Sequence, residues 1–260
     1  DLHSFPTRRS SDLWQIRLAC TMSGNPHPGC PAERGERGPR FRIWGPREGV
    51  EVLRLLQDPM MLLLTLPAVL WAISFHEFCH GYAAKLVGDP TAERSGRLSL
   101  NPLDHFDLVG TLMLLLVGFG WAKPVPINTR YFRHPRRDLV IVSLAGIVGN
   151  ILTAVVCVLF LRFLGEPWYR LAGRAGITVL IQMIVINVGL AAFNLIPIPP
   201  LDGSRVLEAF LPFRFLRYYY WLERYGMIIL LILLVTGIVD VLFNPIFNFL
   251  WGLLPFRSPF

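Results

Sequence analysis

The chain has 260 residues, of which 53% are hydrophobic, and it carries a formal net charge of +7. Several apolar runs approach or exceed the length of about 18 residues that a membrane-crossing helix needs, which excludes an ordinary soluble protein and predicts a multi-pass membrane protein. The lysines and arginines are scattered between these runs, so we interpret them as belonging to loops that face anionic cytoplasmic lipid. For the same reason we expect no nucleic-acid partner.

Residues 1–57 differ from the rest of the chain. They are rich in arginine, proline, glycine and serine and show little periodicity, which predicts a mostly disordered tail. Within this tail, residues 1–13 resemble translated sequencing-adapter sequence, which would make them an artefact. We expect residues 58–260 to form one membrane-embedded domain.

The apolar runs predict an all-α polytopic membrane protein with about four full transmembrane helices. A shorter run, residues 108–120, would be roughly 20 Å long as a helix, less than the hydrocarbon core of about 30 Å. Together with the glycine- and proline-rich sequence after it, this run predicts a re-entrant or β-hairpin segment near residues 108–127. The four full spans are expected at about residues 59–87, 139–164, 177–196 and 226–243.

The first predicted helix carries an ionisable cluster in its second half. His76 and His80 lie four residues apart, so in a helix their imidazoles share one face and can bind a single Zn²⁺. Glu77 lies beside them, where it can act as a general base. Each charged group near the bilayer centre costs about 2.5–3.5 kcal/mol, which favours a shared function for the cluster. In the alternative interpretation, these side chains only hydrogen-bond neighbouring helices.

A catalytic zinc usually takes three protein ligands, and Asp202 is the candidate for the third. It follows the proline-broken end of the third predicted span, where the interrupted backbone can aim a carboxylate inward. In the alternative interpretation, Asp202 and Gly203 only form a turn after a helix.

If Asp202 meets the two histidines, all three lie towards the same side of the membrane. The loops on that side, residues 85–138 and 198–225, carry eight and four lysines or arginines, whereas residues 165–176 carry two. The positive-inside rule therefore predicts a site that opens towards the cytoplasmic side of the cell membrane. The arginine-rich tail before residue 59 does not fit this orientation.

These residues resemble the site-2 protease family of intramembrane zinc metallopeptidases. The likeness covers about residues 58–212 and is closest to the short bacterial type without an inserted PDZ domain. It implies one zinc ion held by His76, His80 and Asp202, with Glu77 as the catalytic base. The matching motifs are residues 76–80 (HEFCH) and 194–203 (NLIPIPPLDG), supported by residues 98–103 (LSLNPL) and 120–126 (GWAKPVP).

The resemblance also draws attention to two asparagines. Residues 145–150 (AGIVGN) match the family's Ala-Gly-Pro-x-x-Asn pattern, except that Ile147 replaces the proline. Asn150 is thereby implied to position the substrate or an intermediate, and Asn194 is a second candidate for this role. Hydrogen bonding between helices is the alternative role for both.

The expected function is that of an intramembrane zinc metalloprotease, a hydrolase that cuts peptide bonds in or near transmembrane segments of membrane proteins. Glu77 would act as general base on zinc-bound water. The expected partners are a transmembrane protein or peptide substrate and the lipid bilayer. The alternative is a non-enzymatic membrane metal-binding protein or metal transporter. The sequence shows no internal repeat and one proline-broken span, which disfavours a transporter.

Overall fold

The computed structural model describes residues 59–110 and 120–255, all of which lie in one unit of the chain, Ile43–Phe260. Over these residues the regular secondary structure is helical and includes no strand, which confirms the predicted all-α class. The predicted tail and residues 111–119 of the predicted re-entrant segment lie outside the described residues. Of that segment, residues 108–110 are helical and residues 120–128 have no regular structure.

Three helices are long and apolar enough to cross a membrane, so the predicted count of four is not confirmed for the described part of the chain. They are α3 (Pro59–Val87), α6 (Pro135–Asn194) and α8 (Phe213–Val235). The shorter helices are α4 (Thr91–Arg94), η1 (Pro102–His105), η2 (Thr129–Tyr131), α7 (Asp202–Phe210) and α9 (Ile238–Leu253).

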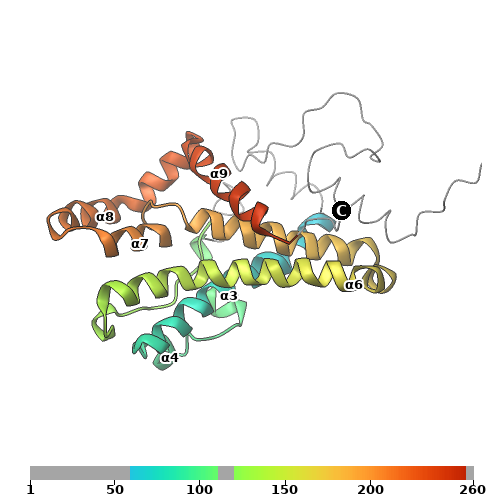
Figure 1. Ribbon diagram of the computed structural model, residues 1–260, viewed down its shortest axis with the longest axis horizontal. Coiled ribbons are helices and arrows are strands. Elements are labelled where there is room, and N and C mark those ends of the chain that lie inside the picture. Colours follow the sequence, from blue (N-terminus) through green and yellow to red (C-terminus); the bar gives the residue numbers. More distant parts are fainter. Residues whose placement is uncertain (1–58, 111–119, 256–260) are drawn as a thin grey trace, which may run out of the picture. The chain divides into compact units, whose positions relative to one another are not determined.

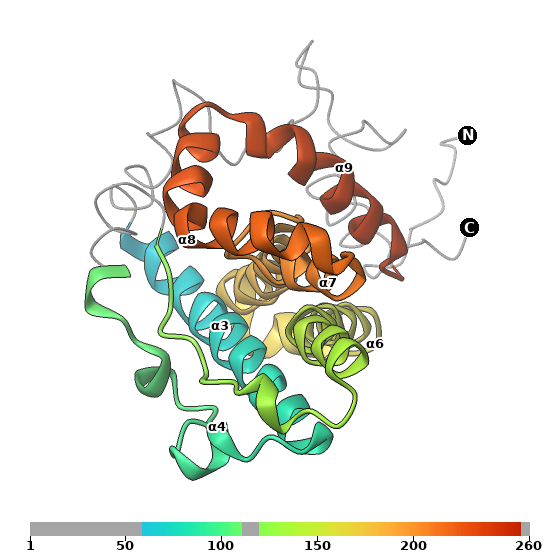
Figure 2. The ribbon, with the colours of Figure 1, turned by 90° about the vertical axis from the view of Figure 1, so that its left-hand side faces the viewer.

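Helix α3 has the bounds that the sequence predicts for the first span. It ends at Gly88, whose φ of 111° lies in a region that glycine adopts readily and other residues avoid. Pro90, two residues later, cannot continue the helix because it lacks a backbone N–H. The chain then crosses back over α3 in the 120–128 segment, whose Val125 contacts Glu77 (Figure 2).

Helix α6 contains two of the predicted spans. Figure 1 shows it folded back on itself, so that the arm before Gly173 lies beside the arm after it. Gly173 (φ 61°, ψ −155°) is the non-helical residue inside α6, and it lets the backbone leave the helical path. The predicted loop at residues 165–176 is therefore wrong apart from Gly173. Its other residues are helical, with Arg170 paired to Glu166 one turn away.

The last predicted span, residues 226–243, is wrong as a single helix. The chain breaks at Thr236 and Gly237, which separate α8 from α9. The Gly237 φ of 71° is left-handed, and its N–H donates to Leu234 O at 3.0 Å, which closes the end of α8. The surrounding sequence is apolar on both sides of the break, so hydrophobicity alone gives no sign of it.

The core lies where the two arms of α6 pack against each other and against α9. Ala154, Val158 and Leu161 of the first arm meet Ile184 and Val188 of the second. The α9 side chains that join this cluster are Val239, Phe243 and Phe247. This packing sets the position of α6, which in turn carries the residues that face α3.

Candidate metal centre

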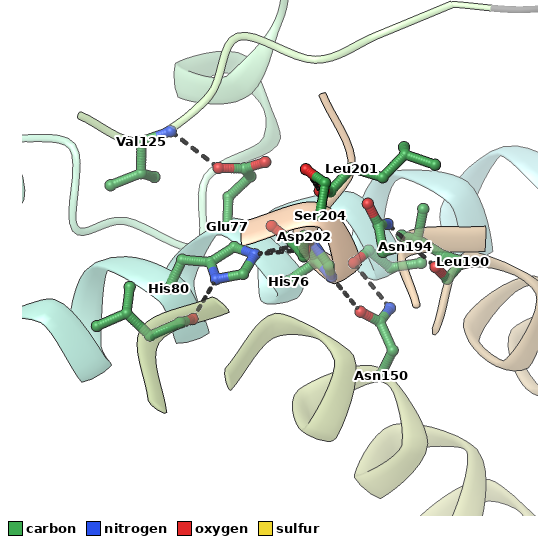
Figure 3. A network of polar contacts seen from close by, with 12 residues as sticks. His76, Glu77, His80, Val125, Asn150, Leu190, Asn194, Leu201, Asp202 and Ser204 are labelled. Atoms are coloured by element: carbon green, nitrogen blue, oxygen red, sulfur yellow. Dashed lines mark hydrogen bonds and ion pairs between the residues drawn. The ribbon is translucent and has the colours of Figure 1, made fainter. Parts of the chain in front are cut away.

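Three side chains from two distant parts of the chain converge beside the first arm of α6. His76 and His80 project from α3, and Asp202 is the first residue of α7 (Figure 3). Asp202 Oδ2 lies 3.1 Å from Nε2 of each histidine, and the two Nε2 atoms are 3.0 Å apart. Within residues 59–110 and 120–255 this is the one group of three potential metal ligands. The structure thus brings together the three residues that the sequence nominates.

The spacing of these atoms suits a zinc ion. Tetrahedral ligands that lie about 2.0–2.1 Å from zinc are themselves about 3.3 Å apart. The three ligand atoms approach this separation, and the set of two imidazoles and one carboxylate is a usual zinc set. Both histidines are buried, with 5% of their surface exposed, while the Asp202 side chain is 15% exposed.

Hydrogen bonds behind the histidines fix the direction of their rings. Asn150 donates from Nδ2 to Ala72 O and Asn187 Oδ1, so its Oδ1 is the acceptor that faces His76 Nδ1 at 2.6 Å. His76 Nδ1 therefore carries the proton, and Nε2 presents its lone pair towards Asp202.

His80 is oriented in the same way by the backbone of α6. Its Nδ1 donates to Val142 O at 2.7 Å, which leaves Nε2 as the free nitrogen. Burial alone would raise the pKa of Asp202, but the adjacent imidazoles of His80 and His76 lower it well below its usual value. The group therefore offers one nitrogen from each imidazole and a carboxylate oxygen as potential ligand atoms.

Glycines allow the helices to approach this closely. A Cβ on Gly146 would lie 2.5 Å from His80 Nε2 and 2.7 Å from the His76 ring, and a Cβ on Gly149 would lie 2.5 Å from Cys79 Sγ. Small residues allow helices to pack closely, and here Gly146 lies against the imidazoles and Gly149 against the Cys79 thiol. A Cβ on Gly203 would lie 2.3 Å from Leu195 O, so α7 can begin this close to the end of α6 because residue 203 is glycine.

Glu77 lies beside the ligand group and not in it. Its Oε2 accepts a hydrogen bond from Val125 N at 2.8 Å (Figure 3). Val125 belongs to the 120–128 segment, which is 48 positions away in sequence. Sequence reasoning misses this partner because a backbone N–H has no residue-specific signal.

The two predicted substrate-positioning asparagines have different surroundings. Asn150 is fully buried, and its contacts are with His76, Ala72 and Asn187. Asn194 donates to Leu190 O of its own helix at 3.0 Å. A role in positioning substrate stays a prediction for both.

One further residue of this network escapes the sequence reasoning. Asn187 is fully buried in the second arm of α6, accepts from Asn150 and donates to Met183 O at 2.7 Å. The sequence feature that could have identified Asn187 is an amide in the middle of an apolar run. Polar groups are rare in such runs unless they have a partner. His105, the last residue of η1, hydrogen-bonds Ser99 O and lies outside the ligand group.

Comparisons with known proteins agree with the chemistry of this centre. The family model of peptidase family M50 matches residues 169–233. "Putative zinc metalloprotease YwhC" of Bacillus subtilis (strain 168) is 40% identical over 201 residues, which cover 75% of this chain and 91% of that protein. "Putative zinc metalloprotease Rip2" of Mycolicibacterium smegmatis is 30% identical over 192 residues, 72% of each chain. No solved structure gives a significant match.

Proposed function

This chain belongs to peptidase family M50, the site-2 protease family of zinc metalloproteases, and on that premise we propose that it is an intramembrane endopeptidase. Its substrates are membrane proteins, cut at peptide bonds in or near their transmembrane segments. The observation that carries the proposal is the convergence of His76, His80 and Asp202 beside Glu77, between helices that are apolar enough to cross a bilayer. Costly polar groups within such helices usually mark a functional site.

In this proposal His76 Nε2, His80 Nε2 and an Asp202 oxygen hold one zinc ion. Asn150 Oδ1 and Val142 O hold the two rings in the tautomer that binding requires. When bound, Zn²⁺ supplies a Lewis acid that acidifies a water molecule and polarises the scissile carbonyl.

Glu77 is the proposed general base. The Val125 N–H occupies Oε2, so Oε1 takes the proton of the attacking water and then passes it to the leaving amine. The presence of Glu77 also disfavours a site that only binds or transports a metal, since such a site needs no carboxylate next to the ligands.

Asn150 and Asn194 are proposed to assist the substrate or an intermediate. An amide N–H near the reacting carbonyl would stabilise developing negative charge on its oxygen. Asn150 donates both amide N–H groups, to Ala72 O and Asn187 Oδ1, so it would have to exchange one of these bonds for the substrate. Figure 3 labels both asparagines, and the contact that supports the assignment is the one between Asn150 Oδ1 and His76 Nδ1.

The proposed site opens towards the cytoplasmic side of the cell membrane. The lysine and arginine excess in residues 85–138 and 198–225 supports this orientation. A transmembrane helix hides its peptide bonds in its own hydrogen bonds, so the substrate has to unwind locally before Glu77 can act on it.

The test compares wild type with Glu77→Gln in proteoliposomes, using a synthetic transmembrane peptide that carries a fluorophore and a quencher. Zinc content should stay equal while kcat falls about 10²–10⁴-fold, the usual contribution of a general base. Glu93→Gln is the matched control, because it removes an exposed carboxylate paired with Lys85 outside the site. Equal cleavage by both proteins would rule out Glu77 as the base. Zinc uptake into the vesicles without cleavage would favour the transporter.

A further inference from the structure

Asp89 is a buried carboxylate that the proposed chemistry does not use. It lies two residues after the end of α3 and has no exposed surface. Within the described part of the chain, no lysine or arginine forms an ion pair with it. A buried charge is costly unless hydrogen bonds compensate it, so the hydrogen bonds of Asp89 indicate its role.

The two oxygens of Asp89 connect two separate parts of the chain. Oδ1 accepts from the backbone N–H of Thr91, at 2.9 Å, and from the Thr91 hydroxyl, which fixes the turn after α3. Oδ2 accepts from the backbone N–H of Asn128 at 2.6 Å, across 39 positions of sequence. Asp89 therefore anchors the far end of the 120–128 segment to the end of the helix that carries Glu77.

The same segment delivers the N–H that binds Glu77. Val125 lies three residues before Asn128, between Pro124 and Pro126, and the proline rings restrict the backbone on both sides of it. The Val125 side chain is buried, and its Cγ1 lies 3.1 Å from the Cβ position of Gly81, one turn after Glu77. Because the stretch between residues 125 and 128 is short and stiff, fixing Asn128 also fixes the position of the Val125 N–H.

The near end of the segment is held by one backbone hydrogen bond and by exposed contacts of Arg97. Lys123 N donates to His105 O at 2.9 Å, and the Arg97 guanidinium donates to the carbonyls of Lys123 and Pro124 at 2.9 and 3.3 Å. Among the described anchors, the Asp89–Asn128 contact is the one made by a fully buried charged group. Hydrogen bonds to buried charged acceptors are the stronger kind.

We propose that Asp89 is a positioning residue for the catalytic base: it holds the 120–128 segment so that the Val125 N–H fixes one oxygen of Glu77 and leaves the other for the attacking water. The inference rests on the proposed role of Glu77. Asp89 acts through the segment and touches neither the metal ligands nor the substrate.

The test uses the full chain, the same fluorogenic transmembrane peptide, and measured zinc content. In Asp89→Asn, an amide N–H₂ replaces one acceptor and faces either Thr91 or Asn128, so the segment loses an anchor. We expect kcat to fall about tenfold, the effect of one lost charged hydrogen bond, with KM and zinc content within twofold of wild type. Glu93→Gln, on the neighbouring helix α4, should keep full activity.

A second variant separates positioning from folding. Val125→Pro removes the N–H itself, whereas Val125→Ala keeps the N–H and shortens the side chain. We expect Val125→Pro to lower kcat at least as much as Asp89→Asn, and Val125→Ala to lower it less. In the double variant, Asp89→Asn should add nothing to Val125→Pro, because both act through one hydrogen bond.

Several results would overturn the proposal. These are a wild-type kcat in Asp89→Asn, a multiplied loss in the double variant, or loss of zinc or of folded protein in Asp89→Asn, which would make Asp89 a residue of the fold alone. The proposed function fails separately. If Glu77→Gln cleaves normally, the base itself is wrong; if Glu77→Gln is inactive and Asp89→Asn is not impaired, only the positioning role is wrong.

Discussion

The first arm of α6 meets its neighbours through two interfaces of different chemistry. Towards α3 it presents Gly146, Gly149 and Asn150, which contact imidazole rings, a thiol and backbone carbonyls. Towards its second arm and α9 it presents Ala154, Val158 and Leu161, which pack among the apolar side chains of the core cluster. One helix therefore combines an interface that fixes individual atoms with one that fills volume.

The two interfaces differ in how well they tolerate substitutions. In a bilayer, lipid tails are as apolar as leucine, so an apolar interface between helices is held there by packing and not by exclusion from water. Such packing degrades gradually when atoms are removed. The interface with α3 has hydrogen bonds and ligand atoms in fixed directions, so a small displacement changes the chemistry. Substitutions of Gly146, Phe243 and Asn150 test this contrast, beginning with the largest expected effect.

The largest effect is expected for Gly146→Ala. The new methyl group would lie 2.5 Å from His80 Nε2, so the histidines and α6 have to separate. We expect zinc affinity to fall about a thousandfold, or about 4 kcal/mol, measured by competition with a chelator. Gly189→Ala, in the same helix, is the control, because no atom lies within 4 Å of the Gly189 Cβ position. Unchanged zinc affinity in Gly146→Ala would mean that α3 and α6 are not this close.

Phe243→Ala tests the apolar interface. Phe243 is 1% exposed in the core cluster, and its removal leaves a cavity that costs about 3 kcal/mol. We expect a lower thermal midpoint in detergent, while zinc bound per folded molecule stays at the wild-type value. Phe249→Ala on the same helix should change little, since Phe249 is 66% exposed. A loss of zinc in folded Phe243→Ala would show that the two interfaces are coupled.

Asn150→Ala tests the hydrogen bonds behind the ligands. Loss of the Oδ1 acceptor frees the His76 ring, and such losses typically weaken metal binding about 10- to 100-fold. Asn194→Ala should leave zinc affinity unchanged, because Asn194 donates to its own helix. If Asn150→Ala instead keeps its zinc and changes only kcat or KM, the residue acts on the substrate, as the family resemblance implies.

The sequence was sufficient to predict that His76, His80 and Asp202 come together, because the reason for grouping them is tied to residue type. Histidines four apart on one helix and a carboxylate after a proline-broken span are recognisable before any coordinates exist. The close approach of Gly146 was also predictable, since small residues favour tight helix contacts. The sequence indicated a buried role for Asn187 only weakly. Its pairing with Asn150 could not be predicted without knowing how the two arms of α6 align.

Other features had no residue-specific signal. The Val125 N–H that binds Glu77 is a backbone group, and its place depends on contacts made by Asp89 and His105 far away in sequence. The helix breaks were misjudged for a related reason. Hydropathy identifies segments that can cross a membrane, but backbone torsions decide where a helix ends, as Gly173 and Gly237 show.

Gly237→Ala tests the second of these breaks and is expected to have the smallest effect. An alanine at φ 71° is strained by about 1 kcal/mol, so the thermal midpoint in detergent should fall slightly. Gly252→Ala, within α9 and with open space at its Cβ position, should be neutral or slightly stabilising, because alanine favours a helix. If Gly237→Ala is as stabilising as Gly252→Ala, then residues 226–243 form the continuous helix that hydropathy predicts. A decrease confined to Gly237→Ala means that the left-handed turn between α8 and α9 exists in the folded protein.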